Sequence, residues 1–222
     1  GGSFSYIDLG EILLPGPVPP SWVSGSIQRV DPSSGVVETI YTECNGRPLR
    51  SPNDLVFDDQ GGFWFTDHGV RLERSSDLTG VFYALADGSS ITEVLFPLEA
   101  PNGVGLSPAG DRLYVAETHT GRIWQWEVPE PGKAVGSGIL APHGDLLAGL
   151  AGHQLLDSLA VDAEGNVCVG TLVNGGITVV SADGSSVHRL PIDDLLVTNI
   201  AFGGPDMRKA YVTSSGTGRL LA

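Results

Sequence analysis

Four residues with oxygen-bearing side chains stand at matching places along this chain. Asn53, Asn102, Asp157 and Asn199 each open an alternating apolar segment, and together they offer three amide oxygens and one carboxylate. Such oxygens are ligands for hard cations such as Ca²⁺ and Mg²⁺, whereas thiolate and imidazole select other metals. A single Asn or Asp at such a place often caps a turn. The recurrence favours a divalent-cation site, provided that the fold brings the four residues together.

The segments that these residues open are copies of one pattern. Each copy has a polar opening residue, an apolar strand, a glycine-containing turn and a second alternating strand. The copies cover residues 51–67, 100–118, 156–171 and 197–213. Their openings are 49, 55 and 42 residues apart, which is typical of the four-stranded blades of a propeller.

Further alternating runs supply the outer strands of such blades, over residues 80–89, 121–128 and 175–185. With 31 Gly and 15 Pro, the chain leaves almost no room for the helices of a βαβ fold. We therefore predict an all-β propeller. Because the first strand of each blade lines the central channel, the four opening residues are predicted to form a ring at one end of it.

The number of repeats predicts how much of a propeller is present. Four copies and a leading pair of outer strands over residues 25–43 amount to about four and a half blades. A propeller closes into a ring that protects its strand edges. We expect residues 1–222 to form one propeller domain that lacks its first blade and its C-terminal end.

Two histidines follow the second strands of two copies. Those strands run back toward the ring, so His68 and His119 are predicted to lie at the channel mouth, where they would bind substrate or carry protons. Asp67 and Glu117 hold equivalent places in their copies. They are predicted to accept hydrogen bonds from turn amides.

The composition excludes several classes of partner. The net charge of −14 argues against nucleic acid and anionic membranes. The only cysteines, Cys44 and Cys168, are far apart and are predicted to be free thiols. Residues 1–20 lack the basic start and apolar run of a signal peptide. We expect a cytoplasmic protein that acts on a small molecule.

The repeated phrases resemble those of the senescence marker protein/gluconolactonase/luciferin-regenerating enzyme-like family, most closely its drug-responsive lactonase branch. The resemblance spans about residues 25–220 and is carried by SPNDLVFD, FWFTD, APNGVGLSP, LYVAET, DSLAVDAEGN and TNIAFGGPD. It implies a six-bladed propeller that hydrolyses lactones and related esters with a bound divalent cation. That cation would be Ca²⁺, or another such as Zn²⁺, Mn²⁺ or Mg²⁺.

The resemblance also implies roles for individual residues. Asn102 and Asp157 correspond to metal ligands, and Asn53 corresponds to a ligand or a substrate contact. Asp157 is also the position expected to act as the base. Ser158 and Asn199 are further candidates for metal or substrate contacts because of their places at the openings, and no family ligand maps to Asn199.

The chain departs from the family pattern at two places. The family's first-blade Glu ligand has no matching phrase, since Glu11 lies in LGEILLPGP. Ser51 replaces an Arg found in members that act on sugar lactones.

The sequence thus predicts a calcium-dependent hydrolase that opens a lactone or small ester at the central channel. The cation would polarise the carbonyl, and Asp157 would orient or deprotonate the attacking water. Two alternatives stay open, because fold alone does not give function. One is a non-catalytic propeller that calcium merely stabilises, and the other is a strictosidine-synthase-like propeller.

Overall fold

The computed structural model describes residues 6–8, 10, 13–16, 18, 21–140 and 142–222. Glu11 therefore lies outside the described residues. The described chain is built from antiparallel strands, and no helix in it is long and apolar enough to cross a membrane.

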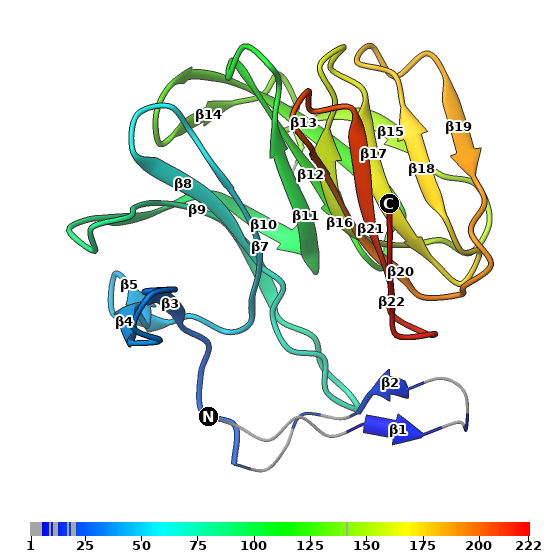
Figure 1. Ribbon diagram of the computed structural model, residues 1–222. Helices are drawn as coiled ribbons and strands as arrows, with labels where there is room; N and C mark the ends of the chain where they lie inside the picture. Colours follow the sequence, from blue (N-terminus) through cyan, green and yellow to red (C-terminus); the bar gives the residue numbers. More distant parts are fainter. Residues whose placement is uncertain (1–5, 9, 11–12, 17, 19–20, 141) are drawn as a thin grey trace.

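Four sheets follow one another in chain order and form the blades of a propeller (Figure 1). The first blade consists of β7 (Pro52–Phe57), β8 (Gly62–Asp67), β9 (Leu78–Leu85) and β10 (Ile91–Glu99). The second consists of β11 (Pro101–Leu106), β12 (Arg112–Glu117) and β13 (Arg122–Glu130), with β14 (Lys133–Val135) and β15 (Asp145–Gly149) both paired to β13. The third consists of β16 (Leu155–Val161), β17 (Val167–Leu172), β18 (Ile177–Val180) and β19 (Val187–Leu190). The fourth has three strands, β20 (Val197–Gly203), β21 (Lys209–Ser214) and β22 (Arg219–Leu221).

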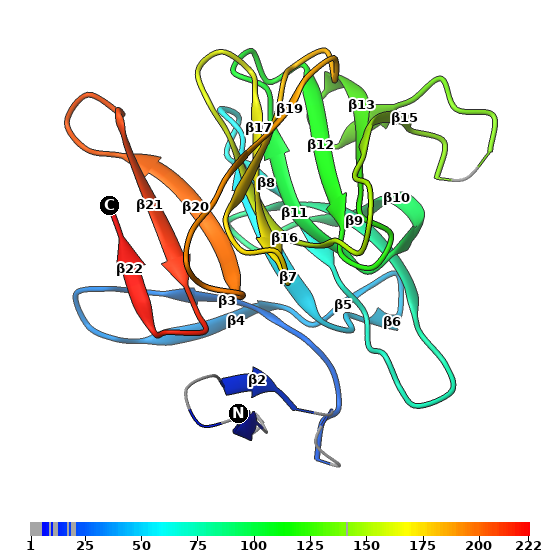
Figure 2. The same ribbon diagram turned by 90° about the vertical axis from the view of Figure 1, so that its right-hand side faces the viewer.

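Three small hairpins precede these blades. They are β1 (Tyr6–Asp8) with β2 (Leu13–Pro15), β3 (Ile27–Val30) with β4 (Val37–Tyr41), and β5 (Glu43–Cys44) with β6 (Arg47–Pro48). The β3–β4 pair matches the predicted leading strands. Figure 2 shows it, in blue, as a separate ribbon below the fourth blade. The predicted all-β propeller arrangement is confirmed, whereas the count of six blades stays a prediction.

The innermost strands stand next to one another, as a propeller requires. Strand β11 contacts both β7 and β16, and β16 contacts β20. Hydrophobic clusters fill the spaces between successive blades. One joins Trp64 of the first blade to Trp126 of the second, and both side chains are fully buried. Burial of such side chains between sheets holds the inner strands, and the residues that open them, in fixed relation.

A glycine turn joins the first two strands of each blade. The turns place Gly61, Gly110, Gly165 and Gly204 at positive φ, where residues with a Cβ are strained. In the first blade, the Asp58 carboxylate accepts hydrogen bonds from the amides of Gln60 and Gly62. These local contacts explain why the second strand of each copy runs back to the end at which the first began.

Candidate functional site

Three of the four predicted opening residues lie in a β-bulge at the start of an inner strand. In the first blade Pro52 pairs with Asp67 and Leu55 with Phe65, so the intervening Asn53 and Asp54 face a single residue of β8. The same irregularity occurs at Asn102–Gly103 in β11 and at Asp157–Ser158 in β16. Bulges redirect side chains and are frequent next to functional sites.

The fourth blade carries the bulge with a register that differs from the prediction by one residue. Val197 pairs with Ser214 and Ile200 with Val212, which puts Thr198 in the place of Asn53, Asn102 and Asp157. Asn199 follows it. The difference arises because the turn between the first two strands is longer in the fourth blade. Ile200 pairs with Val212, which lies 12 residues later, whereas in the first blade Leu55 pairs with Phe65, which lies 10 residues later. The spacings between copies already vary by several residues, so a shift of one residue at the fourth opening could not be recognised from spacing alone.

Asn102 is the most enclosed of the opening residues, with 4% of its surface exposed. Its Nδ2 donates to Thr118 Oγ1 at 3.1 Å, and its backbone oxygen accepts from Thr66 Oγ1 at 2.6 Å. Its side-chain oxygen Oδ1 is buried and has no hydrogen-bond partner in the described chain. A buried acceptor without a donor is costly. A cation at this point would satisfy it.

Asp157 lies next to Asn102. Burial and, to a smaller extent, the charge of Asp54 raise the pKa of Asp157 to about 6, although hydrogen bonds from the Asn102 side chain and the Ser158 amide lower it. The Ser158 amide donates to Asp157 Oδ1 at 3.0 Å. Among the described residues no cationic side chain pairs with this carboxylate, and such a partner usually stabilises a buried charge.

Asp54 is a member of the site that the sequence reasoning missed. Its Oδ2 accepts from the Val104 amide of the next blade at 3.3 Å. Burial raises the pKa of Asp54, whereas hydrogen bonds from the Val104, Leu55 and Leu159 amides and the Ser158 hydroxyl lower it. The only signal in the sequence was that Asp54 is the second polar residue of its opening. It ties β7 to β11 and β16.

The structure therefore gathers Asp54, Asn102, Asp157 and Ser158 around the start of the inner strands. It does not place Asn53 in that group, because the Asn53 side chain is exposed and lines an open groove with Ser26 and Gln28. Among the described residues, no three His, Cys, Asp or Glu side chains are arranged to hold a metal ion. A cation at this site would thus depend on amide and hydroxyl oxygens as well as on the two carboxylates.

The two predicted mouth histidines contact each other. The ring centroids of His68 and His119 are 5.9 Å apart, and the planes meet at 74°. His68 lies two residues after Thr66, and His119 directly follows Thr118. Because both threonine hydroxyls hydrogen-bond to Asn102, the pair lies beside the oxygen-lined site.

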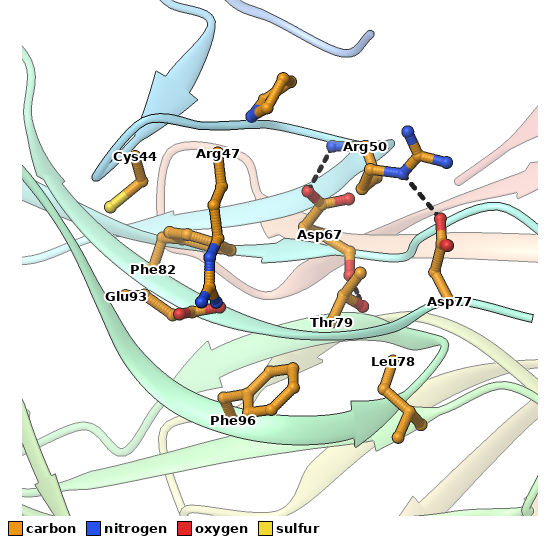
Figure 3. A pocket seen from close by; sticks show the side chains of 11 residues that line it. Cys44, Arg47, Arg50, Asp67, Asp77, Leu78, Thr79, Phe82, Glu93 and Phe96 are labelled. Atoms are coloured by element: carbon orange, nitrogen blue, oxygen red, sulfur yellow. Dashed lines mark hydrogen bonds and ion pairs between the residues drawn. The ribbon is translucent and has the colours of Figure 1, made fainter.

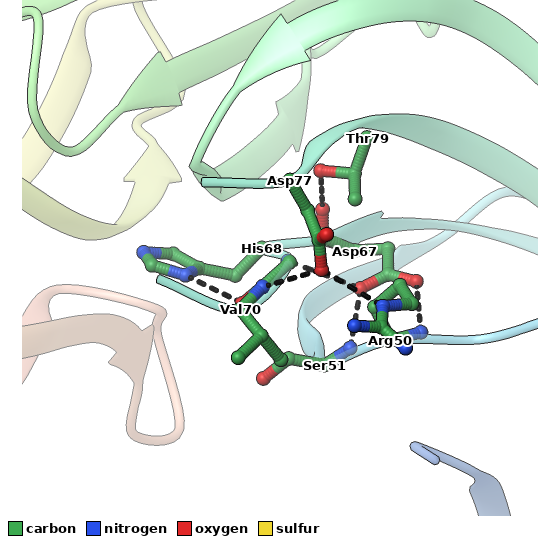
Figure 4. Close-up of polar contacts among 8 residues, drawn as sticks. Arg50, Ser51, Asp67, His68, Val70, Asp77 and Thr79 are labelled. Carbon is green, nitrogen blue, oxygen red and sulfur yellow. Dashed lines mark hydrogen bonds and ion pairs between the residues drawn. The ribbon is translucent and has the colours of Figure 1, made fainter. Parts of the chain in front are cut away.

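The carboxylates that precede these histidines accept turn amides, as predicted. Asp67 accepts from the amides of Arg50, Ser51 and Gly69 (Figure 4). Glu117 accepts from the Glu99 amide at 2.9 Å and from the indole of Trp124 at 3.0 Å. Their role is to shape the loops that carry the histidines. Cys44 and Cys168 are free and buried.

A cavity of about 200 Å³ lies between the β5–β6 hairpin and the first blade (Figure 3). Arg47 and Glu93 line it, from strands β6 and β10, and Asp67 and Asp77 form part of its wall. None of the residues that open the inner strands lines this cavity. It is therefore separate from the oxygen-lined site.

Fold and site together define a β-propeller in which oxygen-bearing side chains gather where the inner strands begin. The sequence profile of the SMP-30/Gluconolactonase/LRE-like region matches residues 23–216. The chain belongs to this family.

Known relatives agree with that assignment. The chain is 33% identical over 168 residues to the lactonase drp35 of Staphylococcus saprophyticus, which is 75% of this chain and 49% of that protein. It is 28% identical over 175 residues to the pentonolactonase XacC of Haloferax volcanii, covering 78% of this chain and 57% of that protein. The chain thus spans about half the length of the curated relatives it matches.

Solved structures show the same fold. A gluconolactonase from Xanthomonas campestris superimposes with a TM-score of 0.68 at 24% identity, covering 85% of this chain and 62% of that one. A calcium-binding regucalcin from Agrobacterium tumefaciens also gives a TM-score of 0.68, at 22% identity, covering 84% of this chain and 60% of that one.

Proposed function

We propose that this chain forms the catalytic channel of a metal-dependent hydrolase that opens a lactone or small ester. The observation that carries the proposal is the buried Asn102 Oδ1, which has no partner in the described chain and lies beside Asp157. The lactonase names of the relatives support the reaction class. A small-molecule lactone is therefore the proposed substrate.

The residues at the site fit a hard divalent cation. Asn102, Asp157 and Asp54 offer one amide oxygen and two carboxylates, and Ser158 adds a hydroxyl, which suits Ca²⁺ best. Asn53 and Asn199 would join them only through side-chain movement or as substrate contacts. When bound, such a cation supplies Lewis-acid polarisation of a carbonyl and stabilises negative charge on its oxygen.

The chain's own residues would then bind and orient the reactants. Asp157, which Asn102 and the Ser158 amide hold in place, would accept a proton from the attacking water. His68 and His119, at the mouth, would contact the part of the lactone that projects from the channel. Thr66 donates to the Asn102 backbone oxygen, and Thr118 accepts from Asn102 Nδ2, so backbone and side-chain amide are both held.

A survey of lactones and aryl esters, with and without Ca²⁺, tests the proposal. We expect calcium-stimulated lactone opening that Asn102→Ala abolishes. The matched control is Asn174→Ala, because Asn174 is exposed and distant in sequence from the openings. Calcium binding without turnover of any lactone or ester would support the non-catalytic binding propeller instead. Cleavage of aryl esters that does not respond to calcium would also contradict the proposal.

A further inference from the structure

The contact between His68 and His119 has the dimensions of a shared metal site. Their centroids lie 5.9 Å apart and their planes are nearly perpendicular. Two imidazoles bound to one tetrahedral metal, with metal–nitrogen distances of about 2.0–2.1 Å, hold their centroids roughly 5–6 Å apart. The two rings come from adjacent blades, so no local turn forces them together.

One nitrogen of His68 is already oriented. Nδ1 lies 3.3 Å from the carbonyl oxygen of Gly69. A carbonyl can only accept, so Nδ1 carries the proton and Nε2 keeps its lone pair. Metal-binding histidines typically donate their second nitrogen to a carbonyl or carboxylate in this way, which fixes the tautomer and the ring.

The loop that carries His68 is held by a network of polar contacts (Figure 4). Asp77 accepts from the Val70 amide at 3.0 Å and from Arg50 Nε at 2.8 Å. Asp67 fixes the beginning of the same loop through the Gly69 amide at 3.2 Å. A ligand on such a loop loses little freedom when it binds, which favours affinity.

Burial and nearby charges shift the pKa values of the two histidines. Burial is the largest cause for both histidines and lowers the pKa of each. The charge of Asp67 partly raises the pKa of His68. For His119, the charges of Arg71 and His68 lower the pKa further, and Glu99 raises it. Both rings are therefore neutral near pH 7, and a metal need not displace protons from them. The acidic neighbours favour a cation, whereas Arg71 opposes one.

We propose that His68 and His119 form a second metal site, at the channel mouth, that binds a transition-metal ion such as Zn²⁺. Water completes its coordination. The site differs from the oxygen-lined one in ligand chemistry, because imidazole suits zinc whereas Ca²⁺ requires oxygen ligands. Calcium therefore fills the inner site without displacing zinc from the histidines.

The test is a titration of the protein with Zn²⁺, followed by calorimetry, in the presence of saturating Ca²⁺. We expect one zinc ion per chain, with affinity reduced about tenfold or more in His68→Gln and in His119→Gln. His188→Gln is the control, since His188 is exposed on β19, and it should bind zinc like the wild type. No lactone is needed, so the outcome does not depend on the proposed hydrolase function.

A further variant keeps the test informative if the histidine variants fold poorly. Arg71→Gln removes a nearby positive charge but no ligand, so it should strengthen zinc binding, which a purely structural role for the pair would not produce. The proposal is overturned if zinc binds equally well to the wild type and both histidine variants. It is also overturned if Ca²⁺ displaces the zinc, or if Arg71→Gln leaves zinc affinity unchanged.

Discussion

Gly103 governs how closely the strands of Asn102 and Asp157 approach each other. A Cβ on Gly103 would lie 2.6 Å from the Leu159 amide nitrogen and 2.7 Å from the Asp157 carbonyl oxygen. Non-bonded heavy atoms prefer about 3.5 Å or more, so Gly103→Ala would drive β16 away from β11 by roughly 0.5–1 Å. Overpacking of this kind costs about 1–3 kcal/mol of folding stability.

The same displacement should weaken the cation site. Calcium contacts span only about 2.3–2.6 Å, so separating Asp157 from Asn102 should lower calcium affinity about tenfold, or about 1.4 kcal/mol. Urea unfolding measures the stability and calorimetry the affinity. Gly149→Ala is the matched control, because its nearest neighbour would be Leu146 Cδ2 at 4.0 Å and its φ is ordinary. If Gly103→Ala behaved like Gly149→Ala in both assays, close approach of these strands would not be what forms the site.

Three further predictions concern carboxylates and a mouth histidine. Asp157→Asn at saturating Ca²⁺ should lower the rate of lactone turnover about 10²–10⁴-fold. Asn199→Ala should lower that rate far less. If Asp157→Asn kept more than about a third of the wild-type rate, Asp157 would be a metal ligand only. For Asp194, burial raises the pKa, but hydrogen bonds from Ser214, Leu196 and Thr217 outweigh it and lower the pKa to about 2. Its ionised form therefore stabilises the fold above about pH 4, and this contribution of about 2 kcal/mol disappears as pH falls toward 2. In thermal unfolding, Asp194→Asn should be less stable than the wild type at pH 7, and this difference in stability should shrink as the pH falls. Asp193 is exposed, so Asp193→Asn should be as stable as the wild type at every pH. His68→Ala should change relative rates among lactones with calcium affinity nearly unchanged, and a tenfold loss of calcium affinity would place His68 among the ligands of the oxygen-lined site.

The strand pattern made the fold predictable from the sequence. Alternating apolar residues and a glycine turn recur in every copy, and each such unit folds into the same pair of strands through local contacts. The second blade shows the limit of that reasoning. Its outer position is divided between β14 and β15, because the chain leaves the sheet between them, and no periodicity signals such a detour.

The site was predictable only in part, for a geometric reason. A β-bulge places two successive residues opposite one, so the rule that alternate side chains share a face fails there. Asp54 was overlooked because alternation assigns it to the opposite face from Asn53. The contact between His68 and His119 depends on how two blades pack, and that is set by long-range burial between sheets.

The central claim is that a divalent cation binds where the inner strands begin. A crystal structure grown with Ca²⁺, with anomalous difference density to locate the ion, tests it most directly. We predict one peak about 2.3–2.6 Å from Asn102 Oδ1 and from a carboxylate oxygen of Asp157. An ion bound elsewhere, or Asn102 and Asp157 separated by more than about 10 Å, would contradict the account, because that separation far exceeds the contact that each ligand must make.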